Sequence, residues 1–211
     1  IKHNKVKPAE FQVSFVGTAF GVVRNKSVMT AHHVLNEGKP RDPKDRFFLF
    51  VVRGNGPSAY HLPVVGFPTE RQDIDFAVLD YGPCPLGDYR IDAVPVATSA
   101  PPDGSRVVTM GLPAPVIKGG NLDPSGTWLG GGDFFLKLHA NEGIVAAQYD
   151  MNGLLYEFNV GWYHGESGGP IFDLDSGAVV SVMQQYRGIQ TPHGVHPGPH
   201  AGRPPSLIAA D

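Results

Sequence analysis

A short glycine-rich segment, GESGGP at residues 165–170, carries the clearest chemistry in this sequence. An acyl-transfer nucleophile needs a hydroxyl that protrudes from a tight turn, with backbone N–H groups nearby to bind the developing oxyanion. The glycines around Ser167 permit such a turn, because glycine adopts backbone angles that other residues avoid. The N–H groups of Gly165 and Ser167 are then the two expected donors. Ordinary hairpin loops also contain short Gly–Ser motifs, so the segment alone does not separate a catalytic loop from an incidental serine.

Two further segments contain groups that would activate such a serine. A serine hydroxyl is a weak nucleophile until an adjacent base accepts its proton, and neutral imidazole suits this role near neutral pH. The segment SVMTAHHV at residues 27–34 places a histidine pair just past an apolar strand. The segment QDIDFAVL at residues 72–79 places two aspartates just before another. A carboxylate there can accept the imidazole N–H, fix its tautomer and stabilise the imidazolium.

The elements that must position these groups are expected to be β-strands. The chain has 27 glycines and 20 prolines without a fixed period, which favours many turns and opposes long helices. Between these breaks, β-branched and aromatic residues form short runs. We expect strands at 11–19, 20–23, 27–30, 46–52, 60–67 and 76–81, and a second group at 106–112, 134–140, 143–148, 154–158, 171–174 and 179–186. Hairpin turns are expected at 24–26 and 175–177, and one helical turn at 32–37.

The three segments together resemble the chymotrypsin-like (trypsin-like) serine peptidases, through Thr-Ala-x-His, Asp-x-Ala-Val-Leu and Gly-x-Ser-Gly-Gly-Pro in the family's order. The resemblance spans roughly residues 11–186. It implies an all-β fold of two six-stranded antiparallel Greek-key barrels, with the active site in the cleft between them. The family's spacing selects His33 over His32, and the position directly before the strand selects Asp75 over Asp73. The implied catalytic triad is His33, Asp75 and Ser167.

The same resemblance implies the domain organisation. Residues 1–90 would form an N-terminal barrel carrying the histidine and the aspartate, and residues 91–190 a C-terminal barrel carrying the serine. The stretch 82–103 holds five prolines and is expected to connect them. Residues 191–211 are expected to form a Gly/Pro/His-rich tail or extended arm. Its three histidines, at 193, 196 and 200, lack a carboxylate or cysteine to complete a ligand set, so we expect no metal and no cofactor.

By resemblance, the primary specificity pocket is walled by residues on two segments. The candidate substrate-binding residues are Gly161, Trp162, Tyr163, His164, Ser181, Val182, Met183 and Gln184. Trp162, Tyr163 and His164 are equally consistent with loop packing. Six residues before Ser167 stands Gly161 and no acidic residue, so no buried carboxylate would neutralise an Arg or Lys of the substrate. We therefore expect cleavage after small or medium uncharged residues.

The residue before the nucleophile, Glu166, departs from the zymogen-activated branch of the family. That branch has an aspartate in this slot, which pairs with a freed N-terminal isoleucine. Ile1 begins this chain, but the residues after it lack the Val-Gly-Gly that accompanies such activation. The closer resemblance is to the disulfide-free branch, which includes bacterial heat-shock-type proteases and viral polyprotein proteases.

Composition limits partners and compartment. The net charge of −3 provides no basic excess for nucleic acid. No apolar run approaches the roughly 20 residues of a membrane span, so no membrane partner is expected. The single cysteine, Cys84, excludes an internal disulfide and is expected to be inert. Together with the polar, basic residues 1–10, which do not resemble a signal peptide, it favours a cytoplasmic location, bacterial or in a host cell.

The sequence thus predicts a serine endopeptidase that hydrolyses protein or peptide substrates through an acyl-enzyme intermediate. Two alternatives stay open: a viral polyprotein-processing protease of the same fold, and an inactive peptide-binding module on that fold. The oligomeric state is not encoded in any pattern that we can identify.

Overall fold

The computed structural model describes residues 14–36, 41–42, 45–52, 59–83, 90–113, 116–118, 121–123, 128–150, 154–191 and 194–205. Within these ranges the regular elements are β-strands and one 3-10 helix, η1 (His32–Leu35). The predicted all-β class is therefore confirmed. No helix in the described part of the chain is long and apolar enough to cross a membrane.

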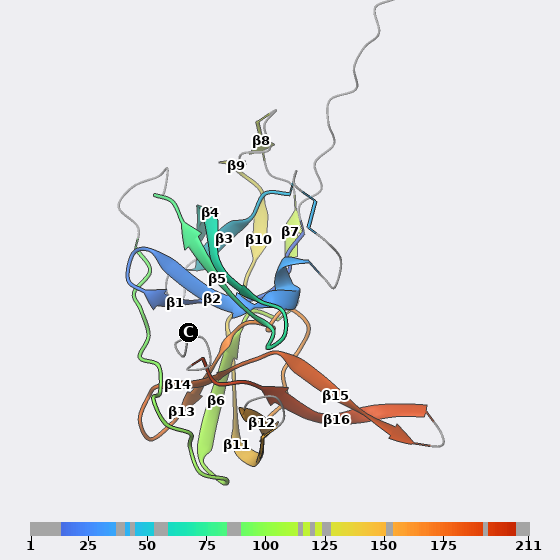
Figure 1. The fold of residues 1–211 in the computed structure, drawn as a ribbon. Helices are drawn as coiled ribbons and strands as arrows, with labels where there is room; N and C mark the ends of the chain where they lie inside the picture. The colour runs from blue at the N-terminus through green and yellow to red at the C-terminus, as the bar shows by residue number, and fades with distance from the viewer. Residues whose placement is uncertain are drawn as a thin grey trace, which may run out of the picture.

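The first sheet contains five antiparallel strands in the order β1-β2-β5-β4-β3. They are β1 (Phe20–Val23), β2 (Ser27–Ala31), β3 (Phe48–Val52), β4 (Ala59–Arg71) and β5 (Phe76–Tyr81). The long strand β4 pairs first with β3 and then with β5, and its register with β5 shifts twice between Val64 and Thr69. Such irregularities bend a strand and increase its twist, so the sheet curls (Figure 1).

The second sheet contains seven antiparallel strands in the order β14-β13-β6-β11-β12-β16-β15. They are β6 (Arg106–Gly111), β11 (His139–Asp150), β12 (Leu154–Asn159), β13 (Pro170–Asp173), β14 (Val179–Val182), β15 (Gln185–Thr191) and β16 (Gly194–Gly202). Between β6 and β11 the chain forms two small strand pairs. These are β7 (Val116–Lys118) with β10 (Asp133–Phe135), and β8 (Asn121–Leu122) with β9 (Trp128–Gly130).

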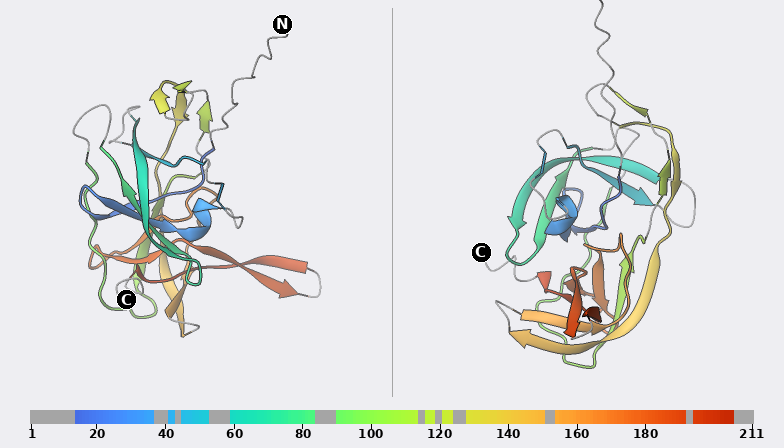
Figure 2. Two further views of the ribbon diagram at one scale, coloured as in Figure 1. Left: turned by 45° about the horizontal axis from the view of Figure 1, so that its top comes forward. Right: turned by 90° about the vertical axis from the view of Figure 1, so that its right-hand side faces the viewer.

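Two curled antiparallel sheets, seen along different directions in Figures 1 and 2, confirm the predicted two-barrel architecture. The two main sheets contain five and seven strands where six and six were expected, and β7 to β10 form the two small pairs. Part of the reason is that the segment 14–19, within an expected strand, forms no strand here. The N–H of Thr18 donates to Ser167 O at 2.8 Å, so this segment crosses to the second half of the chain.

The expected tail also contributes to the second sheet. Strand β16 pairs with β12 at Phe158↔His200, and β15 and β16 continue beyond the sheet as a projecting hairpin (Figure 1). The end of β16 is buried, as Ala201 shows. The domain limits at residues 90 and 190 stay a prediction. Cys84 and His193 lie outside the described residues.

The two sheets share a hydrophobic core. One buried cluster combines residues of β1, β2, β5 and the turn before β5 with residues of β14, and a fully buried side chain of this size contributes about 1.5–3 kcal/mol. Its buried members are Phe20, Met29, Ile74, Phe76, Val179 and Val182. The connector between the halves binds both of them, because Val94 N donates to Gly21 O and Ala97 N donates to Val179 O. This shared packing sets the position of the first sheet's loops against those of the second.

Candidate active site

His33 and Asp75 form a two-point contact at the edge of the first sheet. The backbone N–H of His33 donates to Asp75 Oδ1 at 2.8 Å, and His33 Nδ1 lies 2.8 Å from Asp75 Oδ2. An ionised carboxylate only accepts, so Nδ1 is the protonated nitrogen and Nε2 is left as the basic one. The contact therefore orients the imidazole and sets its tautomer.

The backbone around each residue explains how the two meet. His33 lies in η1, directly after β2 ends at Ala31, and Asp75 ends the turn between β4 and β5. Asp75 has a φ of +57°, in the left-handed region that aspartate tolerates better than most residues. His32 N donates to Asp75 O at 3.1 Å, which ties the two turns together a second time.

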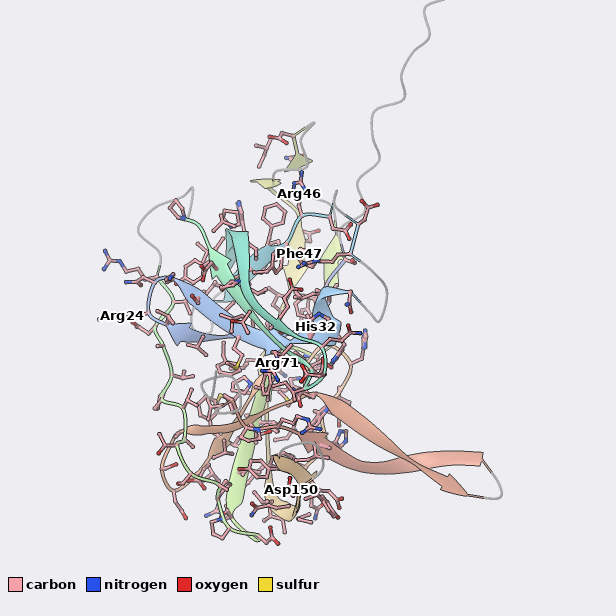
Figure 3. All side chains as sticks on the ribbon, viewed as in Figure 1. Arg24, His32, Arg46, Phe47, Arg71 and Asp150 are labelled. Carbon is pink, nitrogen blue, oxygen red and sulfur yellow. The ribbon has the colours of Figure 1, made fainter. Side chains whose placement is uncertain are left out.

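The neighbouring candidates have other contacts. Asp73 is exposed, and its hydrogen bonds with Arg71 lower the pKa of its carboxyl. His32 Nε2 lies 3.7 Å from Glu70 Oε2. His32 and Arg71 both lie where the first sheet approaches the second (Figure 3). Of the four residues in the two motifs, the structure brings together His33 and Asp75.

The glycine-rich loop that carries Ser167 lies between Tyr163 and the start of β13. Gly165 and Gly168 have φ values of +98° and +85°, which glycine adopts without steric cost. Gly168 N donates to Met183 O at 2.7 Å, and Met183 N donates to Gly169 O at 2.9 Å. The loop is thus fastened to the residue that follows β14.

Two threonines fasten the same loop to the first sheet. Thr18 N donates to Ser167 O and Thr18 Oγ1 donates to Gly165 O, both at 2.8 Å. Thr30 Oγ1 in turn donates to Thr18 O at 2.7 Å. These bonds place the serine loop beside the end of β2, a few residues before His33. No motif had marked Thr18, and Thr30 had entered only as the first residue of Thr-Ala-x-His, since the role of both depends on contacts across the two sheets.

The Ser167 hydroxyl and His33 form no hydrogen bond in the part of the chain that the structure describes. Catalytic hydroxyl–imidazole bonds are often long in structures without substrate and tighten when substrate binds. Of the three predicted triad residues, His33 and Asp75 form one close pair, and the loop of Ser167 packs against the strand that precedes His33.

The N–H groups of Gly165 and Ser167 donate no hydrogen bond among the described residues, whereas the carbonyls of both accept bonds from Thr18. Glu166 N donates to Tyr163 O at 3.0 Å and closes the turn that contains Gly165. Two N–H groups without a described partner, on either side of Glu166 in a braced turn, are consistent with the expected oxyanion-hole donors.

Substituting Gly168 is expected to destabilise the protein. A Cβ there would overlap Thr30 Oγ1 and Thr18 O, would lie 2.9 Å from Ala31 N, and would sit at a positive φ. We expect Gly168→Ala to lower the free energy of unfolding by about 3 kcal/mol, from overpacking and backbone strain together. Gly177→Ala is the matched control, because Gly177 also has a positive φ but nothing within 4 Å of its Cβ position. Urea denaturation measures the unfolding free energy of both variants. Equal losses of unfolding free energy in the two would contradict the packing argument.

Glu166 lies behind this turn with its side chain buried, at 1% exposure. Its Oε2 accepts the N–H of Tyr163 at 2.7 Å, while its Oε1 has no partner among the described residues. Gly111 packs directly against it, since a Cβ at Gly111 would lie 2.7 Å from Glu166 Cβ. Burial raises the pKa of Glu166, and the bond from Tyr163 and the nearby His139 act in the opposite direction. In the zymogen-activated branch the residue at the position of Glu166 pairs with an N-terminal isoleucine; in this chain Ile1 lies outside the described residues.

The raised pKa of Glu166 makes stability depend on pH. In the folded protein the pKa of Glu166 lies above its ordinary value of 4.5. The neutral carboxyl therefore contributes its full stabilisation below about pH 4.5, and this contribution is lost as the pH rises through the folded-state pKa. Glutamine cannot ionise, so Glu166→Gln should gain in unfolding free energy relative to wild type as pH rises from acid to neutral. Urea denaturation across this range tests it. Glu142→Gln, at an exposed carboxylate, should show no such gain.

The pocket candidates divide by burial. Gly161, Tyr163 and His164 are exposed, whereas Trp162 is half-buried against Phe158 and the ring of His200, whose centroids lie 6.4 Å and 4.2 Å away. The side chains of the second segment are buried: Ser181, Val182, Met183 and Gln184. These four residues therefore offer a substrate almost no accessible surface in this structure. Among the described residues, no group of three histidine, cysteine or acidic side chains could hold a metal ion.

Residues 17–182 match the sequence profile of the trypsin-like peptidase domain. No curated protein matches the chain. Solved structures share its fold at low identity. The Rv3671c protease from M. tuberculosis in its active form has a TM-score of 0.58 at 18% identity, over 92% of this chain and 70% of that one. Deg5 has a TM-score of 0.61 at 15% identity, over 92% of this chain and 80% of that one. The serine endoprotease from Yersinia pestis has a TM-score of 0.57 at 17% identity, over 92% of this chain and 55% of that one.

Proposed function

Because this chain belongs to the family of trypsin-like peptidase domains, we propose that it is a serine endopeptidase acting on proteins or peptides through an acyl-enzyme intermediate. One observation carries the proposal. Asp75 holds His33 at two points, the imidazole Nδ1 and the backbone N–H, and the glycine-rich loop of Ser167 is fastened through Thr18 to Thr30, in the strand that leads to His33. This arrangement supports a site that combines a hydroxyl, an oriented base and backbone N–H donors, which acyl transfer requires.

The proposed reaction assigns one role to each group. Ser167 Oγ attacks the scissile carbonyl while His33 Nε2 accepts its proton, and Asp75 stabilises the imidazolium that forms. The N–H groups of Gly165 and Ser167 bind the oxyanion of the tetrahedral intermediate. His33 then gives the proton to the leaving amine, and the acyl-enzyme remains. Water, deprotonated by His33, attacks the ester and releases the acid product together with free Ser167.

Specificity is proposed to favour small or medium uncharged residues before the scissile bond. Gly161 offers no charge, and the acidic residue of this loop, Glu166, is buried with one oxygen bonded to Tyr163 N. A cationic substrate side chain would therefore lose its hydration without gaining an ionised partner. Exposed Tyr163 and His164 are the side chains of this loop that a substrate could contact.

The experiment that tests the function is cleavage of a proteome-derived peptide library by the wild-type chain beside Ser167→Ala. We expect new termini in the wild-type digest, preceded mainly by uncharged residues, and none in the variant digest. Cleavage mainly after Arg or Lys would overturn the specificity. Peptides that bind without being cut, equally by both proteins, would replace the enzyme with a peptide-binding module.

A further inference from the structure

A single buried side chain, that of Gln184, joins three separate segments around the site. Its Nε2 donates to Ile74 O at 2.9 Å and to Asp75 O at 2.8 Å, and its Oε1 accepts the N–H of Arg203 at 3.0 Å. Gln184 is 6% exposed, so these partners replace water. Only one orientation of the amide satisfies all three, because carbonyls accept and a backbone N–H donates.

Gln184 also directly follows the residue that holds the nucleophile loop. The main chain of Met183 bonds to Gly168 N and to Gly169 O on either side of the turn after Ser167. One residue thus fastens the serine loop, and the side chain of the next fastens the turn that ends in Asp75. The two attachment points belong to neighbouring residues and are joined by one planar peptide and the buried Gln184 side chain, so the Asp75 turn and the Ser167 loop are coupled through this dipeptide.

The turn that Gln184 holds needs such support. Asp75 occupies the left-handed backbone region, which is disfavoured for a residue with a side chain and persists where its surroundings impose it. Gln184 donates to the carbonyls of both Ile74 and Asp75, at the point where the turn ends. Losing these bonds would remove the donor to the buried Ile74 O, would leave Asp75 O with His32 N as its donor, and would loosen the turn whose carboxylate orients His33.

The segment after β16 keeps Gln184 in place. Arg203 O accepts bonds from Val182 N at 3.3 Å and from Ser181 Oγ at 3.0 Å, so the residue whose N–H binds Gln184 is itself held on β14. These contacts come from the end of the chain that had been expected to form a tail. They make the orientation of the Gln184 amide a property of the packed fold.

We propose that Gln184 is a positioning residue for Asp75, the aspartate of the proposed triad: it holds the Asp75 turn at a set distance from the Ser167 loop. It acts through Asp75, and its side chain does not touch substrate. This inference rests on the proposed function. It assigns Gln184 to the support of the triad in place of the pocket wall.

Two variants and one matched control test the inference. Gln184→Glu keeps the shape but removes both donors, and Gln184→Met removes every polar contact. We expect each to lower kcat about 10- to 100-fold with KM within about twofold, the usual scale for residues that orient a catalytic ligand. The control is Gln148→Met, since Gln148 also donates to two oxygens, Pro101 O and Asp103 Oδ1, but elsewhere in the second sheet.

A spectroscopic measurement separates positioning from a merely structural role. The His33 Nδ1 proton shared with Asp75 should give a slowly exchanging downfield proton resonance in wild type and in Gln148→Met, and should broaden or vanish in folded Gln184→Met. An unchanged resonance and kcat, or a raised KM with unchanged kcat, would overturn the inference. Should wild type cleave no peptide, the proposed function fails, while the resonance still decides whether Gln184 positions Asp75.

Discussion

Replacing Ser167 with alanine is expected to abolish peptide hydrolysis, lowering kcat by about 10⁶-fold, and to eliminate covalent labelling by a fluorophosphonate. Alanine removes the atom that forms both the acyl-enzyme and the phosphonyl adduct. The backbone amides of Gly165 and Ser167 remain, so binding of peptide should persist. The Ser167 side chain makes no hydrogen bond among the described residues, so the unfolding free energy should change little.

Intact-mass spectrometry after labelling, together with steady-state kinetics on a peptide found by library profiling, measures both effects. Ser176→Ala is the control: Ser176 bonds to Asp173 in a surface turn, and the variant should label and cleave like wild type. Labelling that survives in Ser167→Ala would show a different nucleophile. An intact, folded wild-type chain that never labels near neutral pH would remove the acyl-enzyme mechanism.

Replacing Asp75 with asparagine is expected to lower kcat by about 10⁴-fold while the fold is retained. The carboxylate now accepts from His33 Nδ1 and from His33 N, both at 2.8 Å. An amide nitrogen facing Nδ1 would donate to it, which favours the tautomer with its proton on Nε2. That tautomer cannot accept the proton of Ser167, and the imidazolium would lose its neighbouring charge.

The control for this variant lies two residues away. Asp73 is exposed and pairs with Arg71, so Asp73→Asn should keep nearly all of the wild-type kcat. Both variants should be measured by pre-steady-state acylation and by circular dichroism, which separates loss of chemistry from loss of fold. Equal activities for the two variants would place the acid elsewhere and would remove the basis for the role assigned to Gln184.

Much of the fold and part of the site were predictable from short stretches of sequence. The alternation of apolar runs with glycine and proline predicted β2, β5, β6 and β12 to within one residue at each end, because strand formation is encoded locally. The strand expected at 179–186 divides into β14 and the start of β15. Positive φ values at Gly165 and Gly168 follow from the need for a tight turn around a nucleophile. By contrast, the segment 14–19 had a strand-like composition, yet its N–H at Thr18 bonds to the serine loop. Composition does not encode which partner a backbone group will find.

By itself, the sequence determined the strand-rich class, the family, and the residue types that acyl transfer needs, since each depends on local pattern and order along the chain. The family resemblance had paired His33 with Asp75, and the structure supplies the contact between them. Tertiary structure alone decided that Thr18 and Thr30 fasten the serine loop and that the Gln184 side chain bonds to the Asp75 turn. The physical reason is range: these hydrogen bonds join groups far apart in sequence, and their partners are chosen by how the two sheets pack around a shared core.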